Sequence, residues 1–163
     1  MQQYCQTFLI LYPGSENACL PLKMKKNKLE IDYAYDFKLL GVITPLKGYK
    51  LAWELNTLLR INLVKQPDLM VGFKNTEEKS FAFFAFETRL NRLKLFKNKP
   101  SENEGGKYFL IPEFPHFDFI ILAAMEEPDA HLRLIDQIKS IPSVQLIAPI
   151  PVEGLKSKSN FIF

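Results

Sequence analysis

A proline-kinked apolar run constrains the fold of this chain more than any other feature. Residues 119–124 read Phe-Ile-Ile-Leu-Ala-Ala and contain no polar side chain. An apolar run without alternation is typical of a strand that is buried on both faces, in the middle of a sheet. Pro112 and Pro115 precede it and stiffen a corner, because proline fixes its own φ and cannot donate to a strand ladder. We therefore expect a strand at 108–111, a corner, and then a central strand that the rest of the chain covers.

Further strands are indicated by alternating or β-forming stretches along the chain. They fall at residues 28–33, 37–43, 61–64, 69–73, 79–87, 92–96 and 144–150, the last one stopped by Pro149 and Pro151. The stretch 98–106 is polar and contains proline and glycine, a composition typical of an exposed loop.

Two amphipathic helices are predicted between these strands. Thr44-Pro45 is a typical helix opening, and this helix runs through Arg60. The acids at 126–129 suit the start of a second helix, which ends at Pro142. Each helix has one apolar stripe, made of Leu51, Leu55, Leu58 and Leu59 in the first and of Leu134, Ile135, Ile138 and Ile141 in the second.

These elements predict an α+β fold, a two-layer sandwich of a mainly antiparallel sheet with two helices on one face. A ferredoxin-like arrangement with inserted strands is the specific form that we expect. The reason is that two β-α-β units, 37–64 and 117–150, flank a phenylalanine-rich antiparallel segment. A doubly wound α/β fold is the alternative, but two helices are too few to cover both faces of its sheet.

The first 23 residues differ from the rest of the chain. They hold both cysteines, Cys5 and Cys19, and carry no clear period, and they are followed by Met24-Lys-Lys-Asn-Lys, a plausible bacterial start. We expect 1–23 to be a non-native or disordered extension and 24–163 to form a single domain; the alternative is a short ordered strand at 8–12. Without a disulfide framework or an apolar run of about 20 residues, we expect a cytoplasmic protein with no membrane span.

Common cofactor and catalytic motifs are missing from the sequence. The seven glycines form neither GxGxxG nor a Walker loop, and HExxH and GxSxG do not occur. Histidine is limited to His116 and His131. We therefore expect no cofactor, and a net charge of +3 is too small to imply nucleic acid by itself.

Three polar side chains near the proline corner are the first candidate site. Glu113, His116 and Asp118 lie within six residues, and on a strand His116 and Asp118 would point to the same side. They could share a divalent ion or act as an acid–base pair. The alternative is structural, with Glu113 and Asp118 accepting backbone hydrogen bonds across the corner.

A basic stretch beside aromatic residues is the second candidate. It contains Arg89, Arg92, Lys94, Lys97 and Lys99, next to a strand with Phe81, Phe83, Phe84 and Phe86. Basic hairpins beside aromatic sheets bind single-stranded RNA through stacking and phosphate contacts. The alternative is a solvated outer strand whose lysines block edge-to-edge aggregation.

The chain ends on three large apolar residues, Phe161, Ile162 and Phe163, after a Lys/Ser-rich linker. Such a terminus would be adhesive if it were exposed. We expect it to dock on its own sheet or to add a strand to a partner.

The proline corner resembles a motif that names a family. Ile111-Pro112-Glu113, three further residues and Phe117-Asp118-Phe119 are similar to the IPExxxVDY family, a set of small bacterial proteins with no established activity. The resemblance covers 24–163 and is supported by Asp36-Phe37, the 49–56 helix and the closing residues 155–163. Phe117 and Phe119 depart from the Val and Tyr of the pattern. The resemblance implies a fold and a compartment, with Glu113 and Asp118 as motif residues without an assigned role.

The sequence thus favours a non-enzymatic cytoplasmic module that binds a protein or a small regulatory ligand. A single-stranded RNA-binding module and an enzyme centred on Glu113, His116 and Asp118 are the alternatives. The identity of the partner stays open, as does a homodimer.

Overall fold

The computed structural model describes residues 36–73, 78–101, 108–127 and 129–162. Several expectations fall outside these residues. They concern the extension 1–23, the strand at 28–33, the loop residues 102–106 and Phe163.

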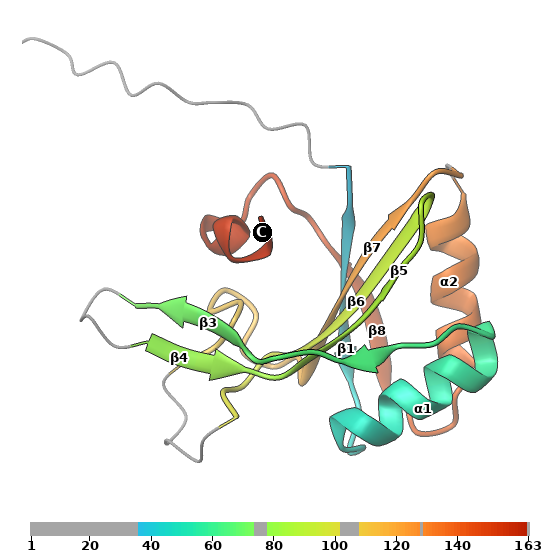
Figure 1. Ribbon diagram of the computed structural model, residues 1–163, viewed down its shortest axis with the longest axis horizontal. Helices are drawn as coiled ribbons and strands as arrows, with labels where there is room; N and C mark the ends of the chain where they lie inside the picture. The colour runs from blue at the N-terminus through green and yellow to red at the C-terminus, as the bar shows by residue number, and fades with distance from the viewer. Residues whose placement is uncertain (1–35, 74–77, 102–107, 128, 163) are drawn as a thin grey trace, which may run out of the picture. The chain divides into compact units, whose positions relative to one another are not determined.

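The described residues form an α+β structure, as predicted (Figure 1). In chain order the elements are β1 (Lys38–Ile43), α1 (Gly48–Leu59), β2 (Val64–Lys65), β3 (Leu69–Gly72), β4 (Glu78–Phe81), β5 (Phe83–Glu87), β6 (Asn91–Lys97), β7 (Phe119–Met125), α2 (Ala130–Lys139), β8 (Leu146–Ile150) and the 3-10 helix η1 (Lys156–Phe161). One antiparallel sheet has the order β2-β5-β6-β7-β1-β8, and β3 and β4 pair separately.

The central position of β7 is confirmed. It pairs with β6 on one side and with β1 on the other, and residues 119–124 are all buried. Its alternate side chains enter two separate cores: Phe119, Ile121 and Ala123 enter one, and Ile120 and Leu122 enter the other.

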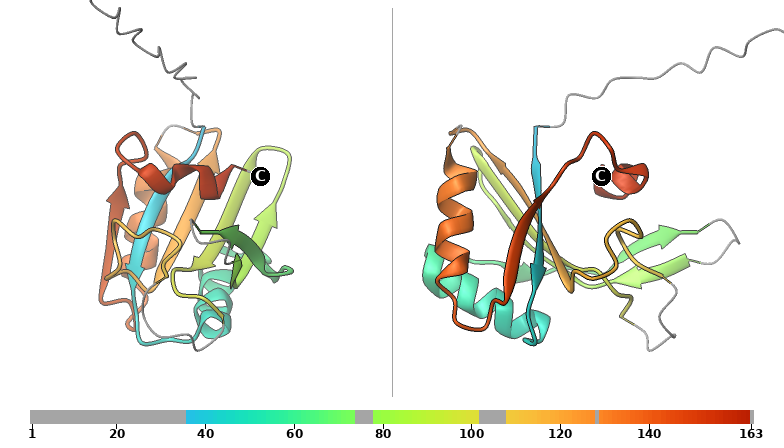
Figure 2. Two further views of the ribbon diagram at one scale, coloured as in Figure 1. Left: turned by 90° about the vertical axis from the view of Figure 1, so that its left-hand side faces the viewer. Right: turned by 180° about the vertical axis from the view of Figure 1, so that it is seen from behind.

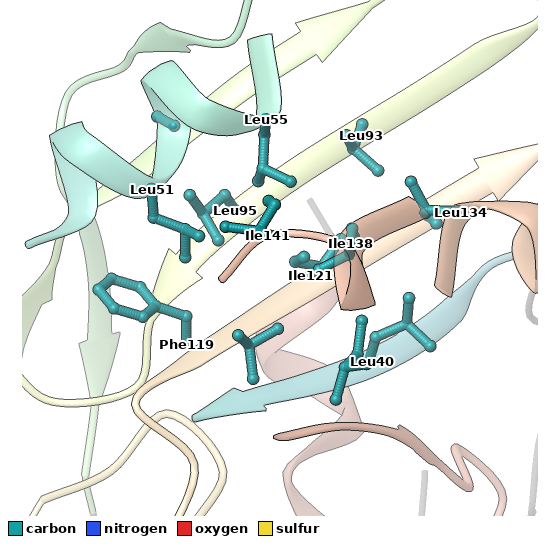
Figure 3. Close-up of a cluster of buried hydrophobic side chains, with 14 of the residues drawn as sticks. Leu40, Leu51, Leu55, Leu93, Leu95, Phe119, Ile121, Leu134, Ile138 and Ile141 are labelled. Carbon is teal, nitrogen blue, oxygen red and sulfur yellow. The ribbon is translucent and has the colours of Figure 1, made fainter. Parts of the chain in front are cut away.

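Both helices cover the same face of the sheet, as predicted (Figures 1 and 2). Leu51 and Leu55 of α1 and Leu134 and Ile138 of α2 are buried against the strands (Figure 3). The order β8-β1-β7-β6, with helices after β1 and β7, is that of a ferredoxin-like sandwich. The strands β2 to β5 are inserted between α1 and β6.

Within the described ranges, the opposite face is covered without an α-helix. Its core joins the β3–β4 pair, the proline corner and the C-terminal segment (Figure 2) through Val71, Phe81, Ile111, Phe117 and Phe161. Gly41 of β1 makes room for this layer, since a Cβ there would lie 2.4 Å from the ring of Phe117.

The first helix starts later than predicted. α1 begins at Gly48, and Thr44 does not cap it. The Thr44 hydroxyl is buried and donates a 2.7 Å hydrogen bond to the carbonyl of Ser143, so it ties the β1–α1 loop to the α2–β8 loop.

Two predicted strands are replaced by segments that bind side-chain amides. Residues 108–111 are not a strand, because the backbone N–H of Leu110 bonds to the carbonyl of Asn98 and that of Ile111 to its Oδ1. Only Val64 of 61–64 is in a strand, since the Asn56 side chain bonds both the N–H and the carbonyl of Leu63.

Two further expectations are corrected at the sheet's margins. Asn98, predicted in an exposed loop, is completely buried. Pro149 lies inside β8 instead of ending it, opposite Leu40. This is tolerated because β8 is the outermost strand, where a missing N–H costs no ladder bond.

Candidate functional site

A cavity of about 800 Å3 opens where β1 leads into α1, and we call it the lysine pocket. Its lining residues are Thr44, Pro45, Leu46, Lys47, Gly48, Tyr49, Lys65, Ala82, Phe84, Leu95, Lys97, Lys99, Asp118 and Phe119. The volume lies in the range of small-molecule sites. The lining unites the end of β6 and the start of β7 with the start of α1, which lies far from them in the sequence.

Four lysines give this pocket a basic character. Lys47 precedes α1, Lys65 lies in β2, and Lys97 and Lys99 come from the end of β6 and the residues after it. Because the described lining contains one carboxylate, that of Asp118, the cavity attracts anions.

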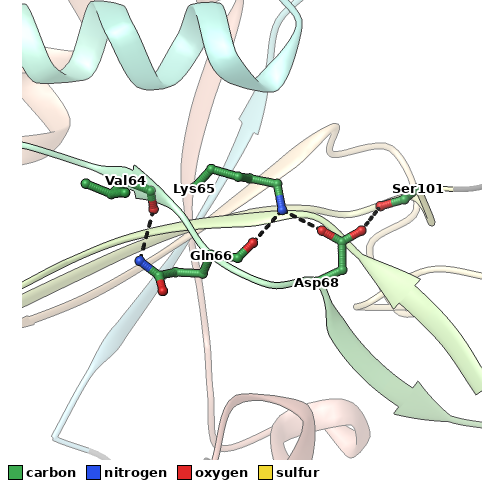
Figure 4. A network of polar contacts seen from close by, with 5 residues as sticks. All are labelled: Val64, Lys65, Gln66, Asp68 and Ser101. Carbon is green, nitrogen blue, oxygen red and sulfur yellow. Dashed lines mark hydrogen bonds and ion pairs between the residues drawn. The ribbon is translucent and has the colours of Figure 1, made fainter.

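Asp68 lies outside the lining and balances the positive charge of Lys65 (Figure 4). Its carboxylate pairs with Lys65 and accepts a 2.7 Å hydrogen bond from the Ser101 hydroxyl. The hydrogen bond from Lys65, then that from Ser101, lowers the pKa of Asp68; burial opposes the shift and the charge of Lys97 adds to it. Asp68 is therefore ionised at neutral pH.

Asp118 sits at the pocket in a fixed position. Its Oδ2 accepts the backbone N–H of Thr44 at 3.2 Å, and its Oδ1 lies 3.8 Å from Nζ of Lys99. Both side chains of the ion pair are partly exposed, so it stabilises the fold only weakly. Among the described residues at the pocket there are thus four lysines and two carboxylates, an excess of two positive charges.

The inner wall of the pocket is apolar. Phe84, Leu95 and Phe119 form it, and Gly48 lies directly against it, since a Cβ there would be 3.2 Å from the Phe119 ring. Tyr49, which is 58% exposed, stands at the rim. The pocket therefore combines a cationic mouth with aromatic surface.

The three residues of the predicted acid–base or metal site have different partners. The Glu113 carboxylate binds the C-terminal segment, through the N–H groups of Lys156 and Ser157 and the Ser157 hydroxyl. The His116 ring packs on Phe117, with 4.2 Å between ring centroids, and Asp118 lines the lysine pocket. Within the described ranges, no three His, Cys, Asp or Glu side chains are grouped to hold a metal ion.

Glu113 is placed by its hydrogen bonds. Burial raises the pKa of its carboxyl, but the bonds from its own N–H, from the Ser157 hydroxyl and from two backbone N–H groups outweigh burial and lower the pKa. Both Glu113 and Asp118 accept backbone hydrogen bonds, as the structural alternative predicted. The donors are in the C-terminal segment and at Thr44, however, and not across the proline corner.

The other motif residues have structural positions. Ile111 and Phe117 are buried in the core below the proline corner, and Phe119 is buried in the core below the helices. Pro112 is exposed in a turn.

The five predicted basic residues do not share one site. Lys97 and Lys99 line the lysine pocket, whereas Arg92 lines another cavity, beside α2. Lys94 lies 3.0 Å from the Glu87 carboxylate, and Arg89 is in the β5–β6 turn. The neighbouring aromatics are used in packing: Phe81 is fully buried and Phe83 stacks on Phe96.

The described part of the C-terminal segment rests on the sheet. Phe161 is buried with its ring edge-on to Phe96, at a centroid distance of 5.6 Å. Asn160 donates to the carbonyl of Leu110, while Ile162 is 48% exposed.

Sequence reasoning named part of the lysine pocket and missed the rest. Lys97, Lys99 and Asp118 were candidates for other sites, whereas Lys47 and Lys65 carried no signal because isolated surface lysines are common. Only the strand order brings these residues together.

Comparison with known proteins adds no functional assignment: no family model matches the chain, and no curated protein matches its sequence. None of the described helices is long and apolar enough to cross a lipid bilayer.

Proposed function

We propose that this chain is a non-enzymatic binding module that holds a small anionic ligand in the lysine pocket. The observation that carries the proposal is the excess of positive charge in the cavity, with Lys47, Lys65, Lys97 and Lys99 around an apolar wall. Ammonium groups around a cavity with an apolar wall attract an anion more strongly than they would on an open surface.

The polar groups of the lining support binding rather than catalysis. The Thr44 hydroxyl already donates to Ser143, and Asp118 accepts the Thr44 N–H. A nucleophile next to a general base is the usual requirement for group transfer. The described lining residues offer no such pair.

The alternatives receive less support from the geometry. An enzyme centred on Glu113, His116 and Asp118 would need these groups to converge, yet each has separate partners. RNA binding by 89–99 would need one basic, aromatic surface, whereas Arg92 and Lys97 line different cavities.

The resemblance to the IPExxxVDY family and the cytoplasmic location are part of this proposal. The resemblance is supported by the motif residues at 111–113 and 117–119. Their positions in the core and in two long-range contacts are compatible with a fold-defining role.

An NMR titration of the full chain with inorganic phosphate at low salt tests the proposal. Amide shifts should concentrate at 44–49 and 97–99, and binding should weaken as salt rises. The double variant Lys47→Gln/Lys97→Gln should lose about tenfold or more in affinity, since charge-assisted hydrogen bonds are lost.

The matched control is Lys50→Gln/Lys139→Gln, which removes the same charge from exposed positions outside the lining. It should bind phosphate like the parent chain. Equal losses in both double variants, or no binding at low salt, would contradict the proposal.

A further inference from the structure

The charge balance and the aromatic lining of the lysine pocket define a narrower class of ligand. We infer that it takes a phosphate monoester of a molecule that also contains an aromatic ring, such as a nucleoside monophosphate; this inference rests on the proposed function. The juxtaposition that carries it is that of Lys47, Lys97 and Lys99 with the rings of Tyr49 and Phe84 around one cavity.

The number of charges comes from the groups at the pocket. Among the residues that the structure describes, four lysines stand against the carboxylates of Asp68 and Asp118, so two positive charges remain to be balanced. A phosphate monoester carries nearly two negative charges at neutral pH, since its second pKa is about 6. A carboxylate or a sulfate ester, with one charge, leaves one ammonium group without compensation.

More highly charged ligands fit the pocket less well. Asp118 is held in the lining by the Thr44 N–H and by Lys99, so its negative charge stays at the cavity. A triphosphate would bring more negative charge than the lysines can balance and would place it near this carboxylate.

The aromatic part of the ligand follows from the walls. Phe84 and Phe119 form one side, and Tyr49 stands exposed at the opening. A flat ring can pack against Phe84 and Tyr49 while its phosphate remains among the lysines, because ring pairs gain energy from offset or edge-on contact. Gly48 keeps this wall open, since a Cβ there would lie 3.2 Å from the Phe119 ring and would touch the Phe84 ring.

Calorimetric titration at pH 7.5 separates the contribution of the ligand's charge to the affinity from that of its aromatic ring. The probes are 1-naphthyl phosphate, 1-naphthyl sulfate, hexyl phosphate and inorganic phosphate. We expect 1-naphthyl phosphate to bind most tightly, by about three- to tenfold over hexyl phosphate and inorganic phosphate, the range of one or two aromatic contacts. The sulfate should bind about tenfold more weakly than the phosphate, since one charge-assisted bond is lost.

Two exposed aromatic residues of α1 give a matched pair of variants. Tyr49→Ala should weaken 1-naphthyl phosphate about three- to tenfold and leave inorganic phosphate unchanged. Trp53 is 64% exposed, lies one turn further on and is outside the lining, so Trp53→Ala should change neither. Both positions are on the surface, so both variants should fold.

The outcomes distinguish this inference from the proposed function. If hexyl phosphate or inorganic phosphate binds as tightly as 1-naphthyl phosphate, the inference of an aromatic ring in the ligand is wrong, while the proposal of an anion-binding pocket stands. If the sulfate matches the phosphate, the charge assignment is wrong. Release of 1-naphthol faster than in buffer would overturn the non-enzymatic role, and no binding by any probe would reject both proposals.

Discussion

Asn98 is the residue on which the proline corner depends. It is completely buried, and its Nδ2 donates to the carbonyls of Phe114 and Phe117 while its Oδ1 accepts the N–H of Ile111. One side-chain amide therefore satisfies three backbone groups of a segment that has no ladder partner. This replaces the strand that the β-forming residues 108–111 would otherwise form.

Replacing Asn98 should destabilise the fold strongly. Asn98→Ala removes three hydrogen bonds and leaves the buried N–H of Ile111 and the buried carbonyl of Phe117 without this partner, and we expect a loss of about 3 kcal/mol in the free energy of unfolding. Asn98→Asp should cost at least as much, because a carboxylate would face two carbonyl oxygens. Urea denaturation measures both, with the exposed Asn62→Ala as a control that should change little; a loss below about 1 kcal/mol for Asn98→Ala would contradict this role.

Gly41 gives a second prediction at the residue scale. Gly41→Ala places a methyl group 2.4 Å from the Phe117 ring, so we expect a loss of about 1–3 kcal/mol from overpacking. Gly72→Ala is the control, since a Cβ at Gly72 meets no atom within 4 Å.

A smaller partner should relieve the clash. In the double variant Gly41→Ala/Phe117→Leu, the loss should be less than the sum of the two single losses, because the added methyl enters space that the ring leaves. Strict additivity in thermal or urea denaturation would show that the two side chains do not compete.

At the scale of elements, the C-terminal helix η1 is held at both ends. Glu113 binds the N–H groups at its start, and Phe161 at its end packs on Phe96 of β6. Phe161→Ala should cost about 3 kcal/mol, the value for a buried aromatic side chain. Deletion of 155–163 should cost more, because it also removes the buried Leu155. The exposed Ile162→Ser is the control, and its unfolding should match that of the parent chain.

The contact of Glu113 with η1 should depend on pH. Its pKa is lower in the folded protein than in the unfolded chain, so its ionised form stabilises the fold above its unfolded pKa. This contribution is lost as the pH falls through the folded value. Glu113→Gln should cost about 0.3–1 kcal/mol at pH 7, the range for an exposed charge at a helix N-terminus, since the amide oxygen can still accept the N–H groups.

The difference between Glu113→Gln and the parent chain should shrink below about pH 4. Thermal unfolding across pH 3 to 7 measures it, and a constant difference over this range would contradict the assignment.

The elements that the sequence predicts well are those whose burial follows from local pattern. The uninterrupted run of β7 and the stripe of α2 at Leu134 and Ile138 needed no knowledge of distant partners. The strand predictions for 61–63 and 108–111 were wrong because the side chains of Asn56 and Asn98 bind the backbone groups that a neighbouring strand would have bound. An asparagine that replaces a strand partner looks like any loop asparagine in the sequence.

At the scale of the whole molecule, β7 joins two cores that share little else. Ile121 belongs to the core under the helices and Ile120 to the core under the proline corner. We expect the amides of β1 and β7 to exchange with deuterium most slowly, since each strand is paired on both sides. Those of the two-stranded β3–β4 pair should exchange orders of magnitude faster. Equal protection of β3 and β7 in native-state exchange would show that both layers open only together.

The lysine pocket belongs to this scale too, and for that reason the sequence predicted only fragments of it. Lys47 and Lys97 are 50 positions apart and line the same pocket because β1, β7 and β6 are neighbours in the sheet. No local spacing encodes such a site, whereas the charges of Lys97 and Lys99 were visible and were assigned to another surface.

The place of Pro149 has a consequence for how the protein behaves at high concentration. An uncharged seven-residue segment such as β7 would be prone to amyloid-like self-association if it were released. In the sheet β7 is paired on both sides. The edge strand β8 contains Pro149, which has no N–H to donate to an incoming strand. The opposite rim is a strand of only two residues. In the native state β7 thus lies away from both edges of the six-stranded sheet, where a further strand could add. Fibril formation should therefore require prior unfolding.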